Sequence, residues 1–375
     1  MNKRSISGYL EDGDTGDTRF RGDHKPKLPL PKPPPPNPLA HNRQPKVRFS
    51  VAEDAPTLQS GGSSYQLPGG PSSDMVVKDF HDALARSPDT AVAVAAIKAL
   101  TAVIERSKET TMMGIERELK DAAASLERCN ETAISLKASC QLFLRYTTRT
   151  NDLDEPIDAS KARLIERGRS FAATSVRARA TIAELGARFI RPGACLLVHG
   201  HSRVVLSLLR RAIKQGIHFS VVVTEGRPDE TGLTMARALD DMGVPVDIIL
   251  DSAIAYALER FRIDMVLVGA EGVVENGGVI NKLGTYQAAL SAHCHNTPFY
   301  VAAESYKFAR LYPLGQHDLP IERKHVDFGP LCPASVRIEN PSRDYTPPKY
   351  ISLLFTDLGV LTPAAVSDEL IQLYL

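Results

Sequence analysis

Short apolar runs alternate with amphipathic segments through the second half of the chain, and this alternation constrains the fold more than any other feature. It begins after Arg191-Pro192-Gly193. The apolar runs predict strands over 194–198, 218–223, 246–250, 264–268, 298–303 and 350–355. The segments between and after them predict helices over 202–214, 229–242, 252–260, 285–295 and 363–373, and the proline-rich stretch 305–350 is expected to be irregular. Apolar strands separated by helices indicate a parallel sheet covered on both faces. Residues 190–375 are therefore predicted to form a Rossmann-like, doubly wound α/β domain.

The preceding part of the chain, residues 75–189, has a helical period instead. Ser87-Pro88-Asp89 combines a capping hydroxyl, a proline at the first helical position and an acid near the positive end of the helix dipole, so it predicts a helix start. Apolar residues then recur at three- and four-residue spacing from Val92 to Val103. Further helices are predicted over 110–129, 131–149 and 157–189, with short connections between them. The segment is thus predicted to be a helical bundle domain.

The first 74 residues are rich in proline and glycine. Pro31–Pro38 reads PKPPPPNP, which favours polyproline II, and the stretch from Lys25 to Arg48 contains basic but no acidic residues. One interpretation is a ligand for a proline-binding module or a weak nucleic-acid tether. The other is a solvated tail that cannot bury enough apolar surface to fold. Composition favours the second, and we predict a disordered tail over 1–74.

Charge and cysteine content exclude several classes of function. The 45 Lys and Arg residues nearly balance the 44 Asp and Glu residues, which argues against direct binding of nucleic acid or of an anionic membrane. The sequence shows neither an apolar run long enough to span a bilayer nor an N-terminal secretory signal, so a cytosolic location is expected. Five cysteines without a CxxC pair fit neither a disulfide framework nor a zinc site. His293-Cys294-His295 cannot converge on one ion, because consecutive helical residues point about 100° apart. We predict no metal and no cofactor.

Candidate site residues follow the carboxyl ends of the predicted strands, where open parallel sheets bind ligands. After the first, second and fourth strands they are His199, Gly200, His201, Ser202 and Arg203; Thr224, Glu225 and Arg227; and Glu271, Asn281 and Lys282. Glycine N–H groups and a helix N-terminus can hold a phosphate, with Arg203, Arg227 and Lys282 as countercharge. Alternatively, the glycines serve only turns and close packing, and the two histidines either act as general bases or bond backbone groups. The residues themselves predict a phosphate-sized pocket and no reaction.

A resemblance to a known family rests on five segments in the same order: LLVHGHSRVVLSLL, TEGRPDETG, VGAEGVVENGGVINKLGTY, FYVAAESYKF and LLFTDLGVLTPAAVSDEL. From about Met75 to Leu375 the chain resembles the regulatory subunits of eukaryotic translation initiation factor 2B, most closely the alpha subunits. The resemblance implies a non-catalytic regulatory subunit of the guanine-nucleotide exchange complex for initiation factor 2. It implies a homodimer that joins the beta, delta, gamma and epsilon subunits and senses the phosphorylated alpha subunit of initiation factor 2.

The helical segments carry basic residues that could face such an acidic partner: Arg106, Lys108, Arg117, Lys120 and Arg128. A solvated helix surface explains the same residues equally well.

The same superfamily contains methylthioribose-1-phosphate and ribose-1,5-bisphosphate isomerases, which use a cysteine and an aspartate to move protons. The resemblance places Gly200 at the cysteine position and Glu271 at the aspartate position. Asn281 and Lys282 match the pair that holds substrate, and Thr231 stands where the methylthioribose enzymes use a glutamine. Glycine has no side chain, and a displacement of about 1 Å, such as glutamate imposes, can cost roughly 100-fold in rate.

We therefore expect no catalytic residues and no enzyme activity. The expected function of the pocket is to bind a sugar phosphate or nucleoside monophosphate at a vestigial isomerase site. The alternative is an active sugar-phosphate isomerase of the aldose-1-phosphate type, with His199 and Glu271 as an unorthodox proton relay.

Overall fold

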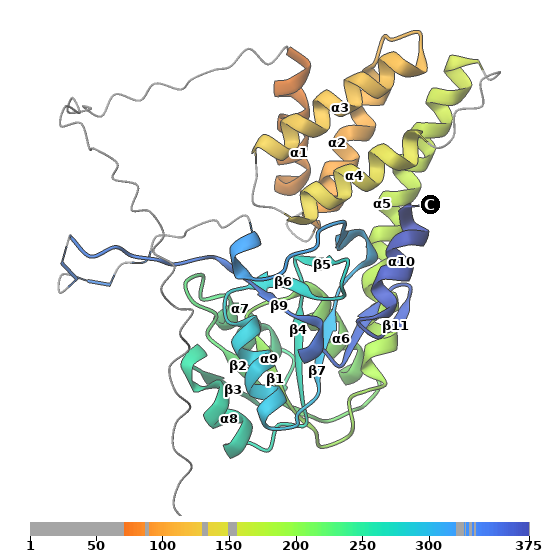
Figure 1. Ribbon diagram of the computed structural model, residues 1–375. Coiled ribbons are helices and arrows are strands. Elements are labelled where there is room, and N and C mark those ends of the chain that lie inside the picture. Colours follow the sequence, from red (N-terminus) through yellow and green to blue (C-terminus); the bar gives the residue numbers. More distant parts are fainter. Residues whose placement is uncertain are drawn as a thin grey trace, which may run out of the picture. The chain divides into compact units, whose positions relative to one another are not determined.

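The structure, a computed structural model, describes residues 71–86, 90–129, 134–148, 156–319, 326, 328–329, 332–333 and 335–374. Residues Tyr65–Leu375 make up one compact unit, in which helices come first along the chain and sheets follow (Figure 1). The predicted tail lies outside the described residues up to position 70, and its last four residues belong to the first helix. The predicted domain boundary at 189/190 stays a prediction. No helix in the described part of the chain is long and apolar enough to cross a bilayer.

Five helices form the predicted bundle: α1 (Pro71–Arg86), α2 (Val92–Arg106), α3 (Met112–Cys129), α4 (Ile134–Thr148) and α5 (Ile157–Ala187). Helix α2 lies at its centre, because almost all of its side chains from Ala93 to Ile104 are buried. Its many alanines let the neighbouring helices approach closely, and Ile97 and Leu100 pack in the same core as Phe143 of α4. The predicted start signal at 87–89 lies outside the described residues. The helix begins at Val92, after Ala91, without a side-chain cap.

The larger sheet has seven strands in the order β11-β10-β7-β4-β1-β2-β3. They are β1 (Cys195–His199), β2 (Ser220–Thr224), β3 (Val246–Ile249), β4 (Met265–Gly269), β7 (Phe299–Ala302), β10 (Leu353–Thr356) and β11 (Gly359–Leu361). All neighbours are parallel except β10 and β11. Val198 in β1 illustrates why the strands are apolar throughout: it is fully buried and pairs with Val223 on one side and Leu267 on the other. The doubly wound α/β fold is confirmed.

Helices cover both faces of this sheet: α6 (Arg203–Lys214), α7 (Thr231–Asp240), α8 (Ile254–Arg260), α9 (Thr285–Cys294) and α10 (Ala365–Tyr374). Residues of α8, α9 and α10 share one hydrophobic cluster with the sheet, and residues of α6 and α7 share a second. Ile182 and Ala187, at the end of α5, belong to the second cluster. The last bundle helix therefore also covers the sheet, which joins the helical and α/β parts.

A second, four-stranded sheet was not predicted, with the order β8-β5-β6-β9. Its strands are β5 (Gly272–Val274), β6 (Val279–Lys282), β8 (Phe308–Ala309) and β9 (Arg343–Thr346), and the short 3-10 helices are η1 (Asp251–Ala253), η2 (Ser305–Lys307), η3 (Gln316–Asp318) and η4 (Pro348–Tyr350). No strand was predicted between positions 268 and 298, where β5 and β6 lie, and the expected irregular stretch at 305–350 is wrong where β8 and β9 lie. The strands are too short to show a period, and β6 pairs with β9, which is distant in sequence.

Candidate functional site

A cavity of about 270 Å³ lies at the carboxyl ends of β1 and β4. Loops from several strands meet there, as expected for an open parallel sheet. The predicted site residues that line it are His199, His201, Ser202, Arg203, Glu271, Asn281 and Lys282. Residues absent from the predicted site complete the lining: Val204, Thr231, Gly269, Ala270, Glu304 and Lys307.

Of the other four predicted site residues, one borders this cavity, one lies behind its lining and two are not part of the lining. Gly200 borders it, because a Cβ at this position would lie 3.1 Å from Thr231 Oγ1 and 3.7 Å from Lys282 Cδ. Thr224 is fully buried behind the lining and bonds His199. The structure does not bring Glu225 or Arg227 to the lining, because Arg227 pairs with Glu225 and Glu230 instead. Arg227 borders a neighbouring cavity.

His199 is held by two hydrogen bonds that leave neither ring nitrogen free. Its Nε2 lies 2.8 Å from the Leu283 carbonyl oxygen, and its Nδ1 lies 2.7 Å from Thr224 Oγ1. Because a carbonyl only accepts, the geometry assigns the proton to Nε2, and the Thr224 hydroxyl donates to Nδ1. Burial lowers the pKa of His199, which favours the neutral ring. This arrangement fits a positioning role better than a general base.

The basic side chains at the cavity already have acidic or carbonyl partners. Lys282 Nζ lies 2.9 Å from Asp229 Oδ2, and Lys307 Nζ lies 2.7 Å from Glu304 Oε2. Arg203 donates to the carbonyl oxygen of Thr90, before α2, at 2.8 Å. An anionic ligand would therefore have to take over cations that the protein itself neutralises.

Glu271 is the second carboxylate at the cavity, and it is bound by Arg343 of β9. This pair was not predictable, because β9 was not predicted. The Glu271 carboxylate would have to leave this ion pair before it could reach a substrate in the cavity.

Glu304 anchors a buried cluster between the cavity and the helical part. It is 1% exposed, and its Oε1 accepts from Tyr306 Oη at 2.9 Å and from Arg179 Nε of α5 at 3.3 Å. Burial tends to raise the pKa of Glu304, but the Lys307 ammonium and the hydrogen bonds bring it down to about 2. Glu304 and Lys307 were not among the predicted site residues. Both belong to the segment FYVAAESYKF, one of the five segments on which the family resemblance rests, and this segment was the signal that could have indicated them.

Thr231 begins α7 at the cavity wall. Its Oγ1 is buried and has no hydrogen-bond partner among the described residues. A helix N-terminus with an unpartnered hydroxyl beside a lysine is suited to bind a phosphate oxygen.

The described residues that line the cavity include no cysteine. Cys195 stands at the start of β1, whereas the cavity lies beyond the other end of that strand. The described part of the chain also contains no group of three or more His, Cys, Asp and Glu residues placed to hold a metal. The geometry supports anion binding, and it supplies no thiol for proton transfer.

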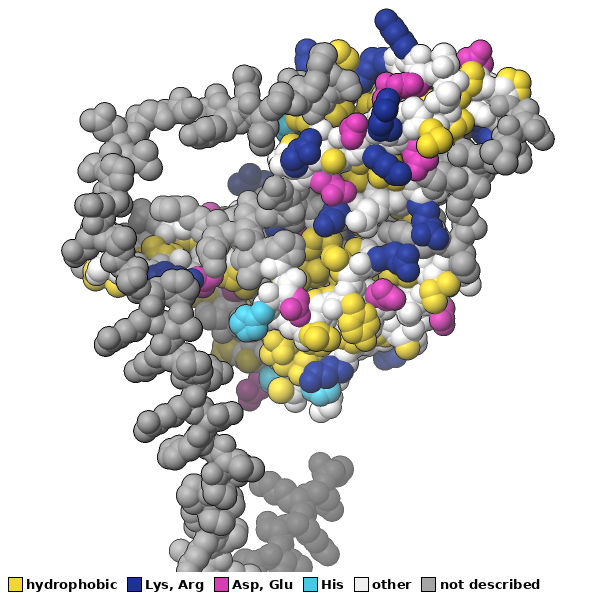
Figure 2. All heavy atoms as spheres, turned by 45° about the horizontal axis from the view of Figure 1, so that its top comes forward, with side chains coloured by type: hydrophobic (Ala, Val, Ile, Leu, Met, Phe, Trp, Pro, Cys, Tyr) yellow, Lys and Arg dark blue, Asp and Glu magenta, His cyan; other side chains and the backbone are white. Residues whose placement is uncertain are grey.

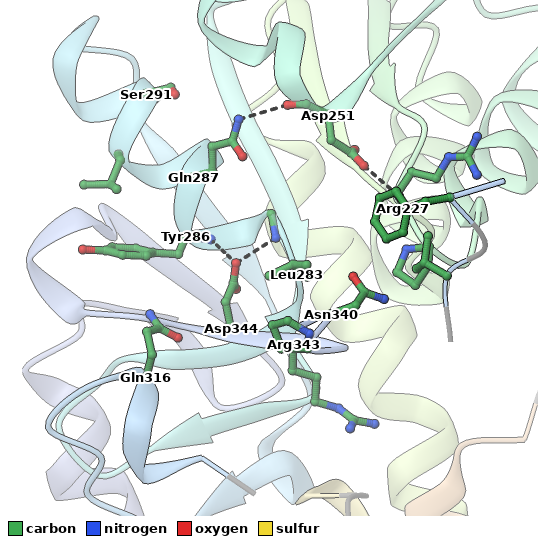
Figure 3. A pocket seen from close by; sticks show the side chains of 16 residues that line it. Arg227, Asp251, Leu283, Tyr286, Gln287, Ser291, Gln316, Asn340, Arg343 and Asp344 are labelled. Carbon is green, nitrogen blue, oxygen red and sulfur yellow. Dashed lines mark hydrogen bonds between the residues drawn. The ribbon is translucent and has the colours of Figure 1, made fainter. Parts of the chain in front are cut away.

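Asp344 of β9 fixes the start of α9. Its Oδ2 accepts the N–H groups of Gly284 at 2.8 Å and Tyr286 at 3.0 Å, so it caps the helix from a different strand. Figure 3 shows this carboxylate at the edge of the neighbouring cavity. Burial raises the pKa of Asp344 to about 7, against the lowering effect of the backbone N–H groups.

This shifted pKa predicts a pH dependence of stability. The pKa of Asp344 is near 3.8 in the unfolded chain, so folding takes up a proton at intermediate pH. The contribution of Asp344 to the free energy of unfolding should fall from about pH 4 to about pH 7, by on the order of 3 kcal/mol. Asp344→Asn should remove this dependence, as measured by urea unfolding across that range.

The informative quantity is the difference in the free energy of unfolding between the wild-type chain and Asp344→Asn at each pH. The lowered pKa of His199 acts in the opposite direction, because the unfolded chain then binds the extra proton and stability rises with pH. His199 is present in both proteins and cancels in the difference. Parallel pH profiles for wild type and Asp344→Asn would contradict the assignment.

Basic residues on the helical part are paired with nearby polar groups. Arg106 lies 2.6 Å from Asp79, Arg117 lies 3.4 Å from Glu109, and Lys120 pairs with Glu116 one helical turn away. Figure 2 shows Lys and Arg side chains interspersed with Asp and Glu on the face it presents. This mixture is typical of a solvated helix surface.

Comparisons with known proteins give the following relatives. The sequence model of the initiation factor 2 subunit family matches residues 85–363. The chain is 45% identical to translation initiation factor eIF2B subunit alpha of Dictyostelium discoideum, over 80% of this chain and 97% of that protein. It is 32% identical to ribose 1,5-bisphosphate isomerase of Pyrococcus furiosus, over 74% of this chain and 87% of that enzyme. The crystal structure of translation initiation factor eIF-2B from Pyrococcus horikoshii aligns with a TM-score of 0.62 and 27% identity, over 77% of this chain and 97% of that one.

Proposed function

The chain belongs to the initiation factor 2 subunit family, and on that premise we propose that it is a non-catalytic, alpha-type regulatory subunit of the guanine-nucleotide exchange complex for translation initiation factor 2. The observation that carries the proposal is the 45% identity to an alpha subunit along 97% of that protein's length. The family match over residues 85–363 includes α2 to α5 of the helical part and both sheets of the α/β part, so the likeness is not confined to one motif.

The proposed assembly is a homodimer that joins the beta, delta, gamma and epsilon subunits. Strand β3 supports self-association through the α/β part, because it lies at an edge of the sheet. Apolar side chains are exposed there and just beyond it: Ile248 by 47%, Leu250 by 60% and Tyr256 by 63%. An exposed apolar sheet edge is favourable to cover with another chain.

The proposed regulatory input is the phosphorylated alpha subunit of initiation factor 2. Its support is the family membership, together with the exposed basic residues of the helical part. Those residues have acidic neighbours within the chain, from which a phosphorylated partner would have to draw them.

The proposed ligand of the 270 Å³ cavity is a sugar phosphate or a nucleoside monophosphate. Lys282 and the start of α7 with Thr231 would hold the phosphate, and Asn281 would bond a sugar hydroxyl. The ligand would act as a structural or regulatory effector, since the cavity keeps groups that bind anions but has no thiol.

An isomerase activity is the second candidate, because the Pyrococcus furiosus relative bears that name at 32% identity. The local chemistry disfavours it. Gly200 offers no side chain, Glu271 is bound by Arg343, and both ring nitrogens of His199 are occupied. A proton relay from His199 to Glu271 would have to break these contacts first.

One experiment separates the two candidates. The chain is purified at native abundance, and the accompanying proteins are identified; in parallel, the isolated chain is incubated with ribose 1,5-bisphosphate and 5-methylthioribose 1-phosphate. We expect the homologous initiation factor 2B subunits to accompany it, and we expect the isolated chain to form a dimer without turnover. Product formation by the isolated chain, or a purification free of those subunits, would contradict the proposal. Activity that appears only after Gly200→Cys with Glu271→Asp would indicate descent from the isomerases.

A further inference from the structure

The loop between β2 and α7 contains two residues whose backbone lies in the left-handed region. Gly226 has a φ of 73°, and Glu230, directly before α7, has a φ of 54°. Glycine adopts this conformation freely, but for glutamate it is unfavourable because the Cβ crowds the backbone. We call residues 226–230 the strap. Both of its ends are turning points of the backbone, and one of them is held under strain, as often occurs at functional sites.

The strap lies between two cavities. Its Arg227 and Pro228 line the neighbouring cavity, of about 1000 Å³, whereas Thr231, the next residue after the strap, lines the proposed phosphate cavity. Figure 3 shows Arg227 at the edge of the neighbouring cavity, with its N–H bonded to Asp251. A movement of the strap would therefore change the wall of the phosphate cavity.

Asp229, within the strap, places a carboxylate at the groups proposed to hold the ligand. Its Oδ2 lies 2.9 Å from Lys282 Nζ, and both side chains are between a quarter and a third exposed to solvent. The residue also stands two positions before Thr231, the first residue of α7. An ammonium and a helix N-terminus favour any anion, so the carboxylate and a phosphate would use the same groups. The chain's own acid thus competes with the ligand.

Hydrogen bonds and an exposed ion pair hold the strap in this position. The N–H groups of Gly226 and Arg227 donate to Asp251 at 2.9 and 2.7 Å, and the N–H of Glu230 donates to the Gly226 carbonyl oxygen at 2.9 Å. Arg227 pairs with Glu230 at 3.0 Å, with side chains 60% and 48% exposed. Exposed ion pairs contribute little to stability, and the left-handed Glu230 opposes this position. The contacts of the strap are therefore of a kind that a competing anion can displace.

We propose that the strap, residues 226–230, is an autoinhibitory element of the phosphate cavity. In the ligand-free chain Asp229 holds Lys282, and a phosphate monoester, with a charge of about −2, displaces this carboxylate and opens the strap. Opening also relieves the left-handed backbone at Glu230. Only the open strap admits the ligand, so the apparent affinity is reduced by the fraction of closed molecules. The proposal rests on the proposed phosphate ligand and adds the element that regulates its access.

The test compares two variants at one position in the full-length chain. Glu230→Val and Glu230→Asn remove the same charge and the same pair with Arg227, but asparagine tolerates the left-handed region and β-branched valine does not. Glu230→Asn is therefore the matched control. Without ligand, hydrogen exchange over residues 225–232, measured by mass spectrometry, should be at least about threefold faster in Glu230→Val. Calorimetry should show that ribose 5-phosphate binds at least about threefold more tightly to Glu230→Val than to Glu230→Asn.

A second measurement does not depend on how well the Glu230 variants fold. In the wild-type chain, saturating ribose 5-phosphate should speed hydrogen exchange over residues 225–232, and Asp229→Asn should speed it without ligand. Binding that leaves this exchange unchanged or slower, or equal exchange and affinity in the two Glu230 variants, would overturn the strap and leave the proposed ligand intact. No binding of ribose 5-phosphate to any of these proteins would instead contradict the proposed ligand, and with it the strap as its regulator.

Discussion

Replacing Glu304 by alanine is expected to lower the free energy of unfolding by about 3 kcal/mol or more. The carboxylate is 1% exposed and bonds Arg179, Tyr306 and Lys307. Its removal leaves an ammonium, a guanidinium and a phenol without their shared acceptor in a mostly buried place. Chemical denaturation at neutral pH measures the loss. Glu304→Gln should retain a part of the stability, because an amide oxygen still accepts from Tyr306.

An exposed ion pair of helix α5, which also carries Arg179, provides the control. Arg169 of α5 lies 2.9 Å from Glu105 of α2, with side chains 66% and 40% exposed. Glu105→Gln should change stability by less than about 1 kcal/mol, because water screens an exposed pair. If Glu304→Ala were as mild as this control, the buried cluster would not join α5 to the sheet.

The same cluster predicts a loss of stability in acid. Because the folded pKa of Glu304 is lowered to about 2, its contribution is present above the unfolded value near 4.5 and is lost as pH falls towards 2. The acid transition of Glu304→Gln should lack this component, and it lies in a different pH range from the effect of Asp344.

Asp229→Asn is expected to tighten the binding of a phosphorylated sugar about tenfold, whereas Lys282→Met should weaken it by at least about tenfold. The reason is the contact between Lys282 Nζ and Asp229 Oδ2 at 2.9 Å, which neutralises the cation that a phosphate would use. Removing the acid frees the lysine, and removing the lysine deletes the countercharge. Calorimetric titration with ribose 5-phosphate measures both changes.

Asp240→Asn is the matched control, because it removes the same charge from an exposed position at the far end of α7. It should leave the affinity unchanged. A gain of equal size in Asp240→Asn would show a general charge effect. No binding by the wild-type chain and by all three variants would contradict the proposed ligand.

The sequence predicted most of the elements around the site because their signals are local. The segment from His199, the last residue of β1, to Arg203, the first residue of α6, lies at the cavity as expected. Asn281 and Lys282 also line the cavity, although they belong to an unpredicted strand. Thr224 and Arg227 were chosen by the same rule, yet one bonds His199 and the other pairs with Glu225. Which side chain at a strand end turns towards the cavity depends on its neighbours and not on its place in the sequence.

Periodicity by itself determined that this chain has helices followed by a parallel sheet, because burial of one helix face or of both strand faces leaves a repeating pattern in the sequence. Only the tertiary structure decided the partners of the charged groups. Arg343 reaches Glu271, Arg179 reaches Glu304, and Asp344 caps α9, each across a long interval of sequence. A carboxylate in the sequence carries no mark of the group that will face it. Its pKa and its role are set by burial and by atoms that arrive only when the chain has folded.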